Sequence, residues 1–92
     1  MKLVPFSRFV VSDRSMLPIY CPGEHVLTFN WTFPKIGDVV VFRERNRFFI
    51  KRVITIKKDE QSVLVCGDNK KGTSKFGPVR LQQIVGKVLF GY

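Results

Sequence analysis

The chain is poor in the side chains that bind metals and form disulfides, since it has one histidine and two cysteines. Cys21 and Cys66 are too few for a disulfide framework, and their spacing fits no zinc motif. With His25 as the only imidazole, a metal site would lack nitrogen and sulfur ligands. We therefore expect no metal and no cofactor. The two thiols are expected in the core or at its rim, and the sequence leaves their pairing open.

Long apolar runs are also absent, and so is any sustained helical period. A membrane-spanning helix needs about twenty apolar residues, and no window of the chain supplies them. Only fourteen residues precede Ser15, and they include Lys2 and Arg8. These cations and the apolar residues around them can touch a membrane surface without anchoring firmly in it. The expected location is peripheral to a membrane, without a transmembrane helix of its own, or cytoplasmic.

What the chain does contain is a series of short apolar runs between turn signals, which is typical of an all-β domain. Ninety-two residues with 45% hydrophobic content predict one small domain, residues 1–92. Strands are expected at Phe9–Ser12, His25–Asn30, Asp38–Arg43, Arg47–Lys57, Ser62–Cys66 and Val85–Phe90. Helical turns are expected after Ser15 and around Arg80–Gln83. Antiparallel hairpins rich in Val, Ile and Phe should coil into a half-open barrel.

The net charge of +9 has three interpretations. Lys and Arg can keep a small domain soluble, attract it to anionic lipid, or bind nucleic acid together with stacking aromatic rings. The cations are scattered over several turns, among them Arg43, Arg45 and Arg47 in one hairpin. We favour solubility or attraction to a membrane surface, with nucleic-acid binding as the alternative.

Three short motifs carry candidate chemistry, namely Ser15-Met16-Leu17-Pro18, Lys51-Arg52 in an apolar strand, and Gly67-Asp68-Asn69. A serine hydroxyl is a poor nucleophile until a neighbouring base takes its proton. The one histidine is expected at the surface or rim, so a lysine is the alternative base, provided that it is neutral. An unperturbed lysine has a pKa of about 10.4, and desolvation among apolar residues lowers it.

Strand alternation does not choose between Lys51 and Arg52, because both faces of the segment from Phe48 to Ile56 are apolar. Chemistry does choose, since arginine cannot lose its proton in a protein and lysine can. We therefore predict Ser15 as nucleophile and Lys51 as base, with Oγ and Nζ about 2.6–3.2 Å apart or somewhat further without substrate. Arg52 is expected to cover the sheet or to pair with an acidic residue, Asp68.

The order of these motifs resembles that of the bacterial signal peptidase I family, serine endopeptidases whose general base is a lysine. The linking segments resemble the family too, at Pro22-Gly23-Glu24, Ile36–Phe42, Phe76–Val79 and Ile84–Val88. The resemblance implies an endopeptidase that cleaves after a small residue in an extended segment, with Lys51 in the position of the catalytic lysine. Its protein substrate would be a signal peptide or an N-terminal propeptide. A membrane surface or a membrane-anchored partner is a further implied contact.

The first motif carries several expected roles. The backbone N–H of Ser15 should face the developing oxyanion, and Pro18 should bend the chain after the serine. Met16 either packs the serine loop beside the substrate groove or is simply a core residue. Family members often have an oxyanion-binding serine, or a glycine, two residues before the nucleophile, where this chain has Asp13. A carboxylate repels an oxyanion, so Asp13 is expected to point away or to pair with Arg14 or a nearby lysine.

The third motif also departs from the family, whose loop is longer and ends in a Ser-x-Asp-Ser-Arg-like sequence. Here the loop is a few residues shorter and lacks that aspartate. Ser74 or Thr73 is expected either to hydrogen-bond the Lys51 ammonium or to cap the turn. Asp68 is expected as a structural hydrogen-bond acceptor near the site, and the residues on either side of it as turn formers.

Two rival interpretations remain. The LexA-like self-cleaving repressors use a similar Ser-Lys pair, but they cleave a linker ahead of their own serine, and fourteen upstream residues leave little chain for that. The alternative outside enzymes is a non-catalytic basic β-barrel that binds nucleic acid or a protein partner.

Overall fold

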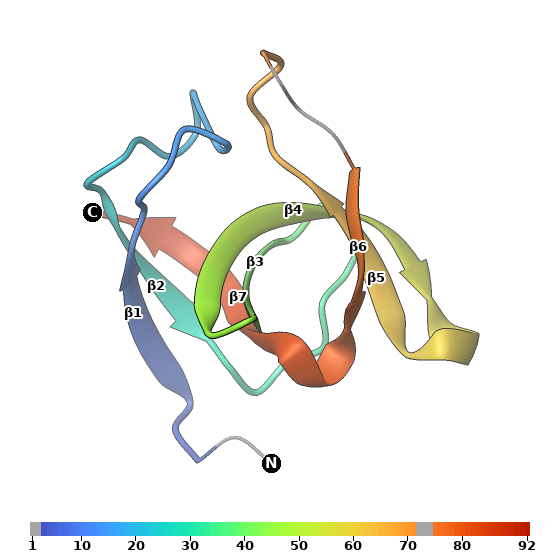
Figure 1. The fold of residues 1–92 in the computed structure, drawn as a ribbon. Helices are drawn as coiled ribbons and strands as arrows, with labels where there is room; N and C mark the ends of the chain where they lie inside the picture. Colours follow the sequence, from blue (N-terminus) through green and yellow to red (C-terminus); the bar gives the residue numbers. More distant parts are fainter. Residues whose placement is uncertain (1–2, 72–74) are drawn as a thin grey trace.

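The computed structural model describes residues 3–71 and 75–92, which form one antiparallel sheet in the order β1-β2-β7-β3-β4-β5-β6 (Figure 1). The strands are β1 (Phe6–Val10), β2 (His25–Phe29), β3 (Val39–Glu44), β4 (Arg47–Lys57), β5 (Ser62–Cys66), β6 (Lys75–Arg80) and β7 (Ile84–Gly91). Two short 3₁₀ turns are η1 (Lys58–Glu60) and η2 (Leu81–Gln83). The sheet coils without closing, which confirms the expected all-β half-open barrel. Among the described residues, no helix is long and apolar enough to cross a bilayer.

Most of the expected strands are present within a few residues of their predicted bounds. The bounds of β4 and β5 are those predicted, whereas β1 begins and ends earlier than expected because it pairs with β2 from Phe6 to Val10. The strand β6 was not predicted, because Gly77 and Pro78 read as turn residues. Since β6 is an edge strand, the missing N–H of Pro78 can face away from the ladder.

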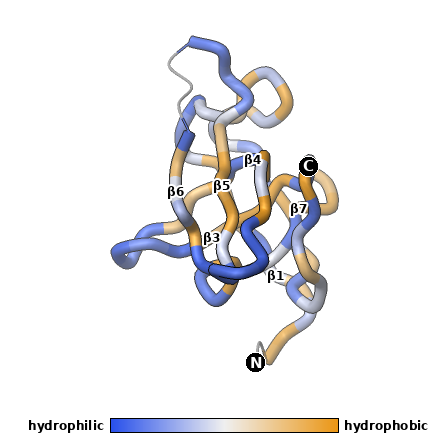
Figure 2. The backbone as a smooth tube through the Cα atoms, turned by 90° about the vertical axis from the view of Figure 1, so that its right-hand side faces the viewer, coloured by the Kyte–Doolittle hydropathy of each residue, from blue (hydrophilic) through white to orange (hydrophobic). Residues whose placement is uncertain are grey.

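Two groups of buried side chains form the core, one on each face of β3 and β4. Along β3, Val39 and Val41 belong to the first group, while Val40 and Phe42 belong to the second. The strand is therefore buried on both faces, because the coiled sheet folds around it. Figure 2 shows hydrophobic colour along parts of β3 and β5 and hydrophilic colour in several connections between strands.

Besides the outer edge of β6, two strand edges are left without a neighbour in the described part of the chain. β1 ends the sheet and pairs only with β2. β4 pairs with β3 along Arg47–Arg52, but with β5 only from Arg52 onward, so its first half has one open side. Successive antiparallel pairings through β2, β7 and β3 make β1 and this half of β4 point in the same direction. The opening of the barrel lies between them.

Candidate active site

The serine motif lies in the loop that follows β1 and is anchored in the core by its second residue. Met16 is fully buried in the first core group, so the alternative that it is a core residue holds. The Tyr20 amide donates to the Met16 carbonyl at 3.0 Å, which closes the helical turn expected after Ser15. Ser15 itself is half-buried. A buried methionine thus fixes the position of its neighbour, the candidate nucleophile.

The Gly67-Asp68-Asn69 turn lies directly against Ser15, which brings together two motifs far apart in the sequence. The Asn69 amide donates to the Ser15 carbonyl at 2.8 Å, and Asn69 Nδ2 donates to the Arg14 carbonyl at 2.9 Å. A Cβ at Gly67 would lie 2.5 Å from the Ser15 carbonyl oxygen. Only glycine leaves room for this approach. Asn69 is therefore a clamp on the serine loop and not merely the turn residue that the sequence predicted.

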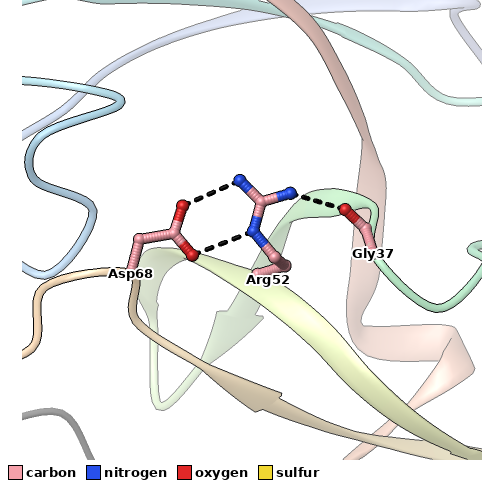
Figure 3. A network of polar contacts seen from close by, with 3 residues as sticks. All are labelled: Gly37, Arg52 and Asp68. Carbon is pink, nitrogen blue, oxygen red and sulfur yellow. Dashed lines mark hydrogen bonds and ion pairs between the residues drawn. The ribbon is translucent and has the colours of Figure 1, made fainter.

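Arg52 and Asp68 join β4 to the same turn through two parallel hydrogen bonds (Figure 3). Nε donates to Oδ1 at 2.9 Å and Nη2 to Oδ2 at 2.7 Å, while Nη1 donates to the Gly37 carbonyl at 2.6 Å. Hydrogen bonding to Asp68 raises the pKa of Arg52. The pair expected from the sequence is confirmed, and Asp68 is a structural acceptor. Tyr20 lies close to this pair, and burial, followed by the Glu24 carboxylate, raises the pKa of its hydroxyl.

Lys51 is half-buried in β4, next to Arg52 and opposite Val40 on β3. The expected hydrogen bond between Ser15 Oγ and Lys51 Nζ is not formed, and Ser15 Oγ donates to Asp13 Oδ1 at 2.8 Å. The structure does connect β4, which carries Lys51, to the serine loop through a series of contacts. Arg52 binds Asp68, and the next residue, Asn69, binds the Ser15 carbonyl.

The hydrogen bonds of Asp13 contradict two of the expectations drawn from the sequence. Among residues 3–71 and 75–92 it pairs with neither Arg14 nor a lysine, and its Oδ1 accepts from both the Ser15 hydroxyl, at 2.8 Å, and the Ser15 amide, at 3.1 Å. The amide that was expected to face an oxyanion is therefore engaged. The physical reason is local, because a short carboxylate reaches the amide two residues later more readily than it reaches a distant cation.

A shallow groove lies at the opening of the barrel, just before the serine loop, and its cavity volume is about 40 Å³. Its lining comes mainly from the end of β1 and the start of β4, with residues Phe9 to Asp13 on one side and Phe48 to Ile50 on the other. The rings of Phe9 and Phe48 lie 5.0 Å apart and bridge the two sides. The lining of the groove is mostly apolar, and Ser12 and Asp13 are the polar residues in it.

The remaining predicted residues are peripheral or lie outside the described part of the chain. Thr73 and Ser74 fall outside the described residues. Cys21 and Cys66 are free thiols, and Cys21 is exposed. The exposed His25 has an edge contact with the Tyr92 ring at 5.4 Å, as expected for a surface imidazole. The described residues include no group of three His, Cys, Asp or Glu placed to hold a metal ion.

No family model matches the chain, and no curated protein matches its sequence. The functional interpretation therefore depends on the motifs and on the geometry described above.

Proposed function

We propose that the protein is a serine endopeptidase of the signal peptidase I type, with Ser15 as nucleophile and Lys51 as general base. The observation that supports this most strongly is the convergence of the three motifs. Asn69 holds the Ser15 carbonyl at 2.8 Å, and the adjacent Asp68 holds Arg52, the direct neighbour of Lys51. These contacts place the serine loop, the turn and the strand that carries Lys51 next to one another.

The proposed reaction needs a shift of the Ser15 side chain from Asp13 toward Lys51. Neutral Lys51 then takes the hydroxyl proton while Ser15 Oγ attacks the carbonyl carbon of the scissile bond. The resulting ammonium gives that proton to the leaving amine, and the C–N bond breaks. Water, deprotonated by the same lysine, hydrolyses the acyl-enzyme and releases the new carboxylate.

The groove between β1 and the start of β4 is the proposed substrate site. Both strands have an open edge there, so an extended peptide can add as a strand and use main-chain hydrogen bonds. The Phe9 and Phe48 rings, which lie 5.0 Å apart, would have to separate to admit the peptide and would then supply apolar contacts for its side chains. We propose that the segment removed is a signal peptide or an N-terminal propeptide, cleaved after a small residue.

Peripheral attachment to an anionic membrane is part of the same proposal. The net charge of +9 provides the attraction, and exposed apolar side chains near the N-terminus, Leu3 and Val4, provide surface contact. This location would bring the groove close to membrane-bound precursors. The alternative is a cytoplasmic maturation protease with one dedicated substrate, which would differ from the membrane-attached peptidase in its location only.

The test is cleavage of extended peptides that contain one alanine within an otherwise bulky sequence, followed by mass spectrometry. Wild type should cut after the alanine, and Ser15→Ala should not. Equal cleavage by both proteins would exclude Ser15 as nucleophile. Cleavage by neither would exclude the peptidase function for these extended substrates.

The β3–β4 hairpin favours one alternative function, the binding of single-stranded nucleic acid. Arg43 lies 6.0 Å from the Phe48 ring centre and Arg47 lies 5.4 Å from that of Phe49. Exposed guanidinium groups beside aromatic rings suit phosphates and stacked bases. Fluorescence anisotropy with a labelled oligonucleotide tests this. Binding that weakens steeply with salt and is lost on Arg47→Glu would support it, with Lys57→Glu as the matched control.

A further inference from the structure

One oxygen of Asp13 holds both of the polar hydrogens that Ser15 would use in catalysis. Oδ1 accepts the hydroxyl at 2.8 Å and the backbone amide at 3.1 Å. The hydroxyl proton therefore points toward a carboxylate and not toward an amine. The amide, which would stabilise the oxyanion, is occupied by a group of the same charge as the oxyanion.

The rest of the serine loop is held in a way that does not involve Asp13. Met16 is buried in the core, and the Ser15 carbonyl accepts from the Asn69 amide at 2.8 Å. Asp13 itself is exposed and, within the described part of the chain, forms no ion pair. Its side chain can therefore rotate into water without unfolding the loop.

The position of Asp13 in the groove indicates what would move it. Asp13 lines the same groove as Phe9 and Phe48, at the end next to Ser15. A peptide carbonyl that approaches Ser15 along this groove would be repelled by the carboxylate and would compete with it for the Ser15 amide. Substrate occupancy and the Asp13 contacts are thus mutually exclusive.

We propose that Asp13 is a latch, a positioning residue that keeps Ser15 in an inactive resting state until an extended peptide in the groove displaces it. The proposal rests on the proposed peptidase function of Ser15. With the latch open, the hydroxyl is free to donate to Lys51 and the amide is free to donate to the oxyanion. The latch would thereby reduce hydrolysis of peptides too short or too weakly bound to displace the carboxylate.

Replacing the latch residue tests the proposal directly. Asp13→Ser should raise kcat/KM for a weakly bound peptide by about tenfold, because two hydrogen bonds to a charged acceptor are released. Asp13→Ala releases the same two hydrogen bonds without adding a hydroxyl that could itself bind the oxyanion, so its rate should rise as well. Asp59→Ser is the matched control, since Asp59 is an exposed aspartate in η1, and its rate should equal that of wild type.

Amide hydrogen exchange provides a readout that does not depend on activity. The Ser15 amide should exchange faster in Asp13→Ser than in wild type, and the Asn69 amide should be unchanged because its contact to Ser15 remains. Circular dichroism melting should show that all three variants fold.

The outcomes separate the latch from the peptidase function. If wild type cleaves and Asp13→Ser is equal or slower, Asp13 is not a latch, although the peptidase function stands. Unchanged exchange at Ser15 would also overturn the latch. If neither wild type nor Asp13→Ser cleaves any peptide, both proposals fail.

Discussion

Arg52 and Asp68 form a two-pronged ion pair, with nitrogen–oxygen distances of 2.9 and 2.7 Å, that ties β4 to the turn holding the candidate nucleophile. A third guanidinium nitrogen binds the Gly37 carbonyl, so one side chain joins three segments (Figure 3). Because Arg52 directly follows Lys51, the pair also fixes the strand position of the proposed base. We propose that the pair positions the site and does not transfer protons.

Arg52→Lys should therefore weaken both stability and cleavage. An ammonium cannot make two parallel bonds to a carboxylate and a third to a carbonyl. We expect a loss of about 1–2 kcal/mol in the free energy of unfolding, since the pair is partly exposed. Chemical denaturation measures the loss. The matched control is Lys87→Ala, which removes the looser pair with Asp38 at 3.7 Å and should cost less than about 1 kcal/mol. An equal loss in both variants would contradict a special role for Arg52.

Gly67→Ala should displace the serine loop. The added Cβ would lie 2.5 Å from the Ser15 carbonyl oxygen, so the loop or the turn must shift. A shift of about 1 Å at a nucleophile can lower the rate about a hundredfold. Peptide cleavage and the melting temperature should be measured together, with the exposed Lys70→Ala as the control in the same turn. Full activity in Gly67→Ala would mean that the close contact does not position Ser15.

Lys51→Arg should abolish cleavage although it keeps the positive charge, because a guanidinium cannot act as a base. Lys51→Met should be equally inactive, yet should unfold at the same denaturant concentration as wild type or a higher one, because methionine fills similar volume without a charge to desolvate. The exposed Lys57→Met, at the far end of β4, should keep wild-type activity. Cleavage by Lys51→Met at the wild-type rate would assign the base elsewhere.

Binding to anionic vesicles should weaken as salt rises. Each basic residue near an anionic surface contributes roughly 1 kcal/mol, and this attraction is screened by salt. Co-sedimentation from low salt to about 1 M salt measures it, with neutral vesicles as the control. Binding that persists at the highest salt would indicate an apolar anchor. No binding at any salt would favour the alternative of a cytoplasmic maturation protease.

The strands and the Arg52–Asp68 pair were predictable because they depend on local alternation and on chemical complementarity. Arg47–Lys57 alternates between two apolar faces, and the planar guanidinium of a partly buried arginine matches a carboxylate. The edge strand β6 was missed because Gly77 and Pro78 are turn residues in most contexts. The position of β6 at the edge of the sheet, together with its irregular register opposite Val63 to Val65, makes proline acceptable there.

The contacts of Ser15 were less predictable, since several polar groups could have bound it and the sequence does not show which of them lies within hydrogen-bond distance. Asp13 had cations as competing partners, and its choice of the Ser15 amide and hydroxyl follows from the local turn. Asn69 was predicted as a turn former, because nothing in the sequence shows that its turn packs on the serine loop. The contact forms because the fold packs the Asn69 turn against the serine loop.

The central claim, that Ser15 is a nucleophile activated by Lys51, is tested most directly by trapping the acyl-enzyme. Wild type is mixed with a peptide ester, quenched in acid after milliseconds to seconds, and weighed intact by mass spectrometry, with tandem fragmentation to locate the adduct. We predict one acyl group on Ser15 in wild type and none in Ser15→Ala or Lys51→Met. An adduct on another residue, an adduct that persists in Ser15→Ala, or no adduct on a peptide that wild type cleaves would contradict the claim.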